Sequence, residues 1–149
     1  MAAKPIPDGY HSATPYLMVQ GAAGLVDFLK RAFGAEETEC LSAPDGTVMH
    51  AEVRIGDSII MIGEAHGEFR AMPSAVHLYV NDADAMYQRA LQAGATSVEE
   101  PKDQFWGDHL GGGKDAFGNL CWVSTHVEDV SPEELKERPE AFMKQMSGS

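Results

Sequence analysis

His50 and Glu52 are the residues whose types and spacing most directly suggest chemistry. They lie in the alternating stretch TVMHAEVRI, residues 47–55, and side chains two apart on a strand point to the same side. An imidazole beside a carboxylate could bind a divalent metal, or act as a base with its orienting carboxylate. The alternative is a solvated, ion-paired strand face that includes Arg54. His77, in the later segment VHLYV, could complete a three-residue catalytic site, or be a hydrogen-bonded histidine in a buried strand.

Aromatic and thioether side chains accompany this group in the predicted strands. Tyr and Trp rings offer large apolar faces and attract cations, and Met fills irregular space. Trp106 and His109 lie in the glycine-rich stretch QFWGDHLGGGKD, which could close over a ligand. We therefore predict a pocket for a small, partly aromatic or cationic molecule, with Glu52 as its charge partner. The predicted ligand-binding residues are Tyr16, His50, Glu52, Met61, His77, Tyr79, Trp106, His109 and Trp122.

The elements that must position these residues occur twice in the same order. Each half has an apolar strand, an amphipathic helix and three further strands, and the halves pair Leu17 with Leu78 and Met61 with Trp122. We predict an α+β fold, a single domain of residues 1–149 in which two paired βαβββ modules form a curved mixed sheet around a cleft. The modules cover about residues 12–64 and 74–126, with a linker at 65–73 and a short C-terminal helix at about 132–146.

Local signals mark the helices. The first helix carries an apolar stripe and ends at Gly34, a residue type that favours the position after the last turn. Ser131, Pro132 and Glu134 form a capping box with proline at the first helical position, and Pro139 is expected to break or kink the helix that follows. The stripe of the first helix consists of Leu25, Val26, Phe28, Leu29, Ala32 and Phe33.

Strand alternation predicts which side chains face the cleft. Where a helix covers one face of a sheet, every second residue of a strand points to the other face. A register error of one residue would invert a strand, so this assignment depends on the apolar pattern. The cleft-facing residues are predicted to be Thr14, Tyr16 and Met18; His50, Glu52 and Arg54; Met61; Ala75, His77 and Tyr79; and Trp122 and Ser124.

Composition excludes several classes of partner. The chain of 149 residues carries a formal charge of −12, from 23 acidic and 11 basic residues. This balance argues against nucleic acid and anionic membranes. Only Cys40 and Cys121 are present, and neither an apolar leader nor an apolar run of membrane-spanning length is found. We expect a cytoplasmic protein with reduced thiols.

Several motifs together resemble the vicinal oxygen chelate superfamily, which includes glyoxalase I, bleomycin-resistance proteins, fosfomycin-resistance enzymes and extradiol dioxygenases. They are HSATPYLMV, DFLKRAFGAE, DGTVMHAEVRIGDSIIMI, VHLYVNDAD, FWGD, DAFGNLCW and THVEDVSPEE. The last three are most similar to the PhnB-like, glyoxalase-like subgroup. The resemblance implies paired βαβββ modules and a homodimer, with modules paired within one chain or swapped between chains.

The resemblance also implies where a metal would bind. The ligand positions of metal-using members fall on Thr14, Met61, Ala75 and Trp122, and none of these types is a good ligand for a divalent metal that prefers His and carboxylate. We therefore expect metal-free ligand binding, as in bleomycin-resistance proteins, and no cofactor.

Two alternatives remain. One is a metal-dependent lyase, isomerase or resistance transferase that uses a displaced His50, Glu52 and His77 set. The other is an assembly module whose cleft is filled by its own side chains.

Overall fold

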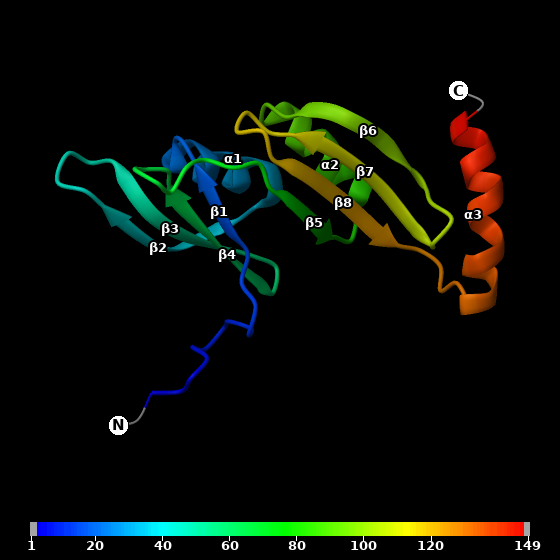
Figure 1. The fold of residues 1–149 in the computed structure, drawn as a ribbon, viewed down its shortest axis with the longest axis horizontal. Coiled ribbons are helices and arrows are strands. Elements are labelled where there is room, and N and C mark those ends of the chain that lie inside the picture. The colour runs from blue at the N-terminus through cyan, green and yellow to red at the C-terminus, as the bar shows by residue number, and fades with distance from the viewer. Residues whose placement is uncertain (1–2, 148–149) are drawn as a thin grey trace.

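The computed structural model describes residues 3–147 (Figure 1). The first half of the chain contains β1 (Tyr16–Val19), α1 (Ala22–Phe33), β2 (Glu36–Ser42), β3 (Val48–Ile55) and β4 (Ser58–Glu64). The second half repeats this order with β5 (Ala75–Tyr79), α2 (Ala83–Gln92), β6 (Thr96–Asp103), β7 (Asp108–Lys114) and β8 (Leu120–His126). The chain then forms α3 (Pro132–Ser147).

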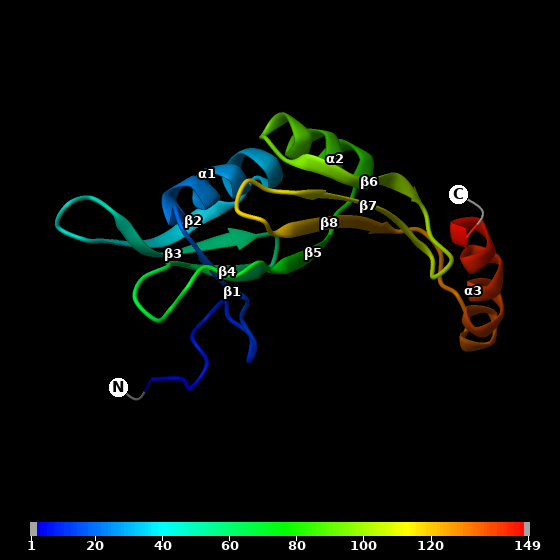
Figure 2. The same ribbon diagram turned by 45° about the horizontal axis from the view of Figure 1, so that its top comes forward.

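Each half forms its own four-stranded mixed sheet. The strand orders are β1-β4-β3-β2 and β5-β8-β7-β6, in which β1 is parallel to β4, β5 is parallel to β8, and the other neighbours are antiparallel. Figure 2 shows the sheets next to each other, with α1 and α2 on the same side of them. The predicted α+β fold with βαβββ modules and a C-terminal helix is confirmed.

Helices α1 and α2 form one core with the sheets. All six residues of the apolar stripe in α1 are buried, and on the strands the core takes alternate residues such as Ala51, Val53, Ile60 and Ile62. The residues between them therefore point to the side of the sheets away from the helices, which we call the open face. The modules are also tied by Arg89 of α2, whose Nε donates to the carbonyl oxygen of Arg31 in α1 at 2.7 Å.

The ends of α1 follow different rules. Gly34 adopts a left-handed conformation with φ of 68°, as predicted, and its N–H satisfies carbonyls of the last turn. At the other end Gly21 has no capping side chain of its own. Instead the Glu64 carboxylate, from the end of β4, accepts hydrogen bonds from the N–H groups of Gly21 and Ala22, each at 2.9 Å. An anion at this end of a helix is favourable because the first N–H groups are unpaired.

The C-terminal helix begins as predicted but does not break at Pro139. Ser131 Oγ accepts a hydrogen bond from the Glu134 N–H at 3.2 Å. The Glu134 carboxylate pairs with Arg138 at 2.9 Å instead of completing the capping box. A break, one of the two outcomes expected at Pro139, is not found, because α3 continues through this residue. Arg138, which also binds Glu128 at 2.8 Å, stabilises the turn before the proline. No helix among residues 3–147 is long and apolar enough to cross a membrane.

Candidate functional site

The pair His50 and Glu52 lies in the open face of the first module. Only 5% of the Glu52 surface is exposed, and both of its oxygens have partners. His50 Nε2 lies 2.9 Å from Oε2, and the hydroxyl of Tyr10 donates to Oε1. Because a carboxylate oxygen can only accept, Nε2 carries the imidazole proton. Tyr10, in the segment before β1, was not among the predicted site residues.

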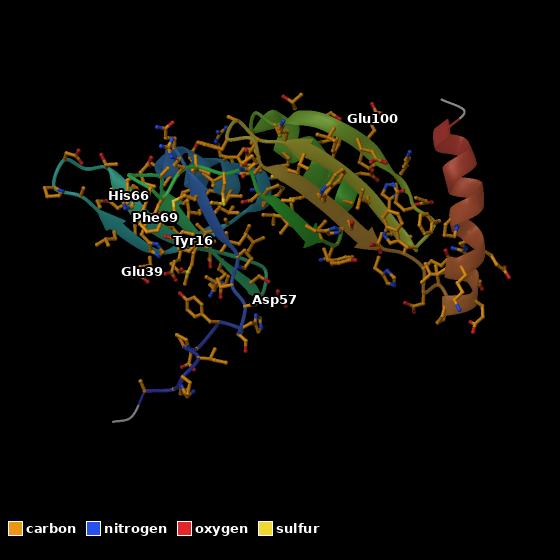
Figure 3. The ribbon with its side chains drawn as sticks, in the orientation of Figure 1. Tyr16, Glu39, Asp57, His66, Phe69 and Glu100 are labelled. Carbon is orange, nitrogen blue, oxygen red and sulfur yellow. The ribbon has the colours of Figure 1, made fainter. Side chains whose placement is uncertain are left out.

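Side chains from all four strands form a row beside this pair. The strand register places Tyr16 next to Met61, Met61 opposite Glu52, and Glu52 opposite Glu39. The Tyr16 hydroxyl is 3.5 Å from His50 Nδ1. Figure 3 shows Tyr16 and Glu39 on the first module, beside the N-terminal segment. A pocket of about 530 Å³ opens here, and its lining includes Tyr10, Glu39, Glu52 and Met61.

The open face of the second module carries a separate aromatic group. His77 Nε2 is 2.8 Å from Ser124 Oγ, and the His77 ring lies 5.0 Å from the Tyr79 ring. The Trp122 indole covers Gly112 so closely that a Cβ at Gly112 would lie 2.3 Å from the ring. The open face of the second module therefore carries aromatic rings, of which Trp122 packs on Gly112, whereas the open face of the first module carries the buried Glu52 carboxylate.

A buried carboxylate, Asp108, fixes the far end of the second module. Its exposed fraction is 2%, and it accepts hydrogen bonds from Tyr79 Oη and Trp106 Nε1 at 3.0 Å and from His126 Nδ1 at 2.8 Å. Burial raises the pKa of Asp108, but the hydrogen bonds from His126, Tyr79 and Trp106 outweigh it and leave the pKa below its ordinary value. Asp108 was not among the predicted site residues, although the motif FWGD contains it.

His109 points toward α2 and is held by two carboxylates. Its Nδ1 lies 2.8 Å from Asp103 and its Nε2 lies 3.0 Å from Asp84 of α2. His126 is held in the same way, with Nδ1 at 2.8 Å from Asp108 and Nε2 at 2.7 Å from Asp129. Two acceptors on one imidazole favour its doubly protonated form. The hydrogen bonds to these aspartates accordingly raise the pKa of both histidines.

These two histidines predict that the protein loses stability as the pH rises. A raised pKa in the folded state gives stabilisation that is complete below the ordinary value of 6.5 and lost as the pH rises through the folded-state pKa. The thermal midpoint should therefore fall between about pH 6 and pH 8. Thermal unfolding across this range should give a shallower slope for His109→Gln and for His126→Gln. His11→Gln, outside both groups, should keep the wild-type slope, and equal slopes in all variants would contradict the prediction.

The predicted ligand-binding residues are thus divided among three places. Tyr16, His50, Glu52 and Met61 lie together on the first module. His77 and Tyr79 line a pocket of about 580 Å³ between the modules, together with Asp57 of the β3–β4 turn, which Figure 3 labels. The remaining three, Trp106, His109 and Trp122, belong to the second module.

The donor set does not fit a divalent metal. Among the described side chains, those of residues 3–139, no three His, Cys, Asp or Glu are grouped as metal ligands would be. His50 and Glu52 are adjacent, but His77 is on the other module. The positions that the family resemblance implies, Thr14, Met61, Ala75 and Trp122, offer at most a hydroxyl and a thioether, whereas such metals prefer His and carboxylate.

Comparisons with known proteins agree with this architecture. An uncharacterized protein of Mycobacterium bovis is 35% identical over 134 residues, which cover 83% of this chain and 88% of that protein. The crystal structure of TioX from Micromonospora sp. ML1 is 25% identical with a TM-score of 0.63, covering 78% of this chain and all (100%) of that chain. The fosfomycin resistance protein FosX from Mesorhizobium loti, 15% identical, has a TM-score of 0.55 over 77% of this chain and 91% of that chain, which shows the fold alone.

The sequence profile of one family covers most of the chain. It is described as the Glyoxalase/Bleomycin resistance protein/Dioxygenase superfamily, and it matches residues 11–123. This chain therefore belongs to that superfamily.

Proposed function

We propose that this protein binds a small, partly aromatic, cationic molecule on its open face without the metal of the family's enzymes. The observation that carries the proposal is the row on the first module. The buried Glu52 carboxylate and Met61 line a pocket of about 530 Å³, and Tyr16 is the neighbour of Met61 on the next strand. A ring and a thioether suit the apolar body of such a ligand, and a carboxylate suits its charge. The net charge of −12 also favours the approach of a cation.

We also propose that this protein is a PhnB-like member of its superfamily, that it forms a homodimer, and that it is located in the cytoplasm. Tyr16 and Tyr79 are both exposed on the open face, with exposed fractions of 49% and 66%. A second copy could place the rings of its second module opposite the carboxylate of the first module, which would enclose the ligand. A reducing compartment suits the two thiols, which are unpaired. Burial and the nearby Asp115 charge raise the pKa of Cys121 to about 12, which keeps that thiol unreactive.

Alanine at Tyr16 or Trp122 should weaken ligand binding more than it lowers stability. Aromatic cations would be titrated by calorimetry, and loss of one ring should weaken binding about tenfold, the effect of a partly desolvated cation–π contact. Phe69→Ala is the matched control, because Phe69 is exposed to a similar extent, 55%, but lies in the linker. Loss of folding with unchanged affinity would contradict the proposed role of these rings.

The adjacency of His50 and Glu52 favours a metal-dependent enzyme as the second candidate. It would need a third ligand in addition to these two, and His77 could supply one only if a second copy brought it close. Metal analysis of protein purified without a histidine tag separates the candidates. About one equivalent of zinc, nickel, manganese or iron per chain, lost in His50→Ala together with thermal stability, would favour the enzyme. A value near zero, with no stabilisation by added ions, would favour metal-free binding.

A further inference from the structure

The N-terminal segment, residues 3–13, contacts the candidate site through one side chain. The Tyr10 hydroxyl donates to Glu52 Oε1, and Pro5, Ile6 and His11 of the segment line the same pocket. Figure 1 shows this segment, in blue, leaving the body of the protein from the start of β1. Among the described residues, Tyr10 to Glu52 is the only hydrogen bond between the segment and the rest of the chain.

The remaining interactions of the segment are local. Lys4 pairs with Asp8 at 2.9 Å with both side chains exposed, and the Tyr10 N–H bonds the Pro7 carbonyl oxygen at 3.1 Å. Residues 3–9 are exposed. An exposed ion pair contributes little, and a segment with few buried contacts opens at low cost. Tyr10 can therefore leave Glu52 while the sheets stay folded.

When Tyr10 leaves, one oxygen of the Glu52 carboxylate needs a new hydrogen-bond donor. Oε2 keeps its contact with His50 at 2.9 Å, but Oε1 loses its donor. A buried carboxylate oxygen without a donor is costly, so a ligand that replaces Tyr10 must bring an N–H or O–H group to Oε1. A cation without an N–H or O–H group cannot donate this hydrogen bond to Oε1.

The surrounding charges select between neutral and cationic donors. Glu39 lies opposite Glu52 in the strand register and lines the same pocket. The described lining contains no Lys or Arg that could neutralise these carboxylates. A protonated amine is attracted to both carboxylates, and its hydrogen bond to Glu52 is stronger than that of a neutral hydroxyl.

We propose that Tyr10 is a built-in occupant of the Glu52 site, which a primary or secondary arylalkyl ammonium ion displaces. This inference rests on the proposed function and narrows its ligand class to cations that carry N–H donors. Oε1 accepts either the Tyr10 hydroxyl or a ligand N–H. The N-terminal segment consequently competes with the ligand.

Three matched probes test the ligand class by calorimetry on the full chain. They are 2-phenylethylammonium, its N,N,N-trimethyl derivative, which keeps the charge without N–H donors, and 2-phenylethanol, which keeps a donor without the charge. The primary ammonium should bind about tenfold or more tightly than either of the others, the difference expected from one charge-assisted hydrogen bond. Equal affinity for the primary and trimethyl ions would overturn the inference.

Substitutions test the role of Tyr10. Tyr10→Phe removes the competing hydroxyl and should tighten binding of the primary ammonium about tenfold, whereas Glu52→Gln should abolish the preference for it. Tyr87→Phe is the matched control, because Tyr87 also donates or accepts a side-chain hydrogen bond, with Ser97 at 2.5 Å, but lies in the core. Its affinity should equal that of the wild type. Weaker binding by Tyr10→Phe would overturn the inference.

A second readout follows the segment itself. With 3-fluorotyrosine incorporated, ¹⁹F resonances report the four tyrosines, and Tyr10→Phe assigns the relevant one. The primary ammonium should move that resonance toward the position of a solvated phenol. Binding that depends on Tyr16 and Trp122 but leaves the Tyr10 resonance unmoved would overturn this inference and leave the proposed function intact. Failure of every aromatic cation to bind the wild type and Tyr10→Phe would overturn both.

Discussion

Replacing Asp108 by alanine should lower the free energy of unfolding by about 1–3 kcal/mol, the scale expected when a buried hydrogen-bonding partner is removed. Asp108 is 2% exposed and accepts hydrogen bonds from Tyr79, Trp106 and His126. Alanine would leave the indole N–H and the histidine without this acceptor at the end of the second sheet. Urea unfolding followed by tryptophan fluorescence measures the loss.

Asp129→Ala is the matched control for this prediction. Asp129 contacts the same histidine, His126, at 2.7 Å, but its side chain is fully exposed. Exposed ion pairs contribute at most about 1 kcal/mol, so this variant should stay close to the wild type. Equal destabilisation by the two substitutions would show that burial of Asp108 does not matter, and a stable Asp108→Ala would show that the three donors find other acceptors.

Strand alternation predicted most of the strands that form the site, because a one-residue shift would expose the core. Ala51 and Val53 are completely buried (0% exposed), and this places His50 and Glu52 on the other side, as predicted. The edge strands β2 and β6 were harder to predict individually. Every residue of β2 is exposed, and β6 contains Pro101 and three charged residues besides Asp103. Neither β2 nor β6 has an alternating apolar pattern of its own. Each is a strand because it pairs with β3 or β7, and this tertiary interaction is not visible in the local sequence.

The chemistry of the site depended on contacts that no local pattern indicates. Tyr10 meets Glu52 across 42 positions of the chain, and Glu52 is only 5% exposed, whereas a solvated, ion-paired face was the alternative that the sequence left open. Asp108 similarly accepts hydrogen bonds from Tyr79 and His126, which are 29 and 18 positions away in the sequence. An acidic residue in a strand is usually exposed, so the sequence did not indicate that Glu52 and Asp108 are buried. Their burial depends on the packing of segments that are distant in the sequence.

The glycines of β7 were equally hard to place from the sequence, where they belong to a glycine-rich stretch that could close over a ligand. GGGK has the composition of a flexible loop, yet Gly111, Gly112 and Gly113 are all buried within a central strand. Glycine is required there by contacts across the sheet: a Cβ at Gly111 would lie 2.7 Å from the Pro101 ring, and one at Gly112 would lie 2.3 Å from Trp122. The small residues therefore leave space for larger side chains from neighbouring strands.

Gly112→Ala should consequently destabilise the protein by about 1–3 kcal/mol, the usual cost of overpacking a well-packed site. The added methyl would lie 2.3 Å from Trp122 Cε3 and 2.6 Å from Cζ3, and the indole would have to tilt away from the sheet. Alanine in place of glycine would otherwise favour the folded state through the unfolded chain's entropy, so a loss identifies the collision. Urea unfolding measures stability, and the emission maximum of Trp122, measured in a Trp106→Phe background because the chain has two tryptophans, reports its displacement.

A double-mutant cycle assigns the loss to this pair. In a Trp122→Ala background the new methyl has room, so Gly112→Ala should become neutral or stabilising, with a coupling of about 1 kcal/mol or more between the two positions. The tilt should also weaken binding of aromatic cations in the single variant, because the proposed ligand face would no longer have its geometry. Additive effects on stability would mean that the destabilisation by Gly112→Ala comes from the β7 strand itself and not from contact with the Trp122 indole.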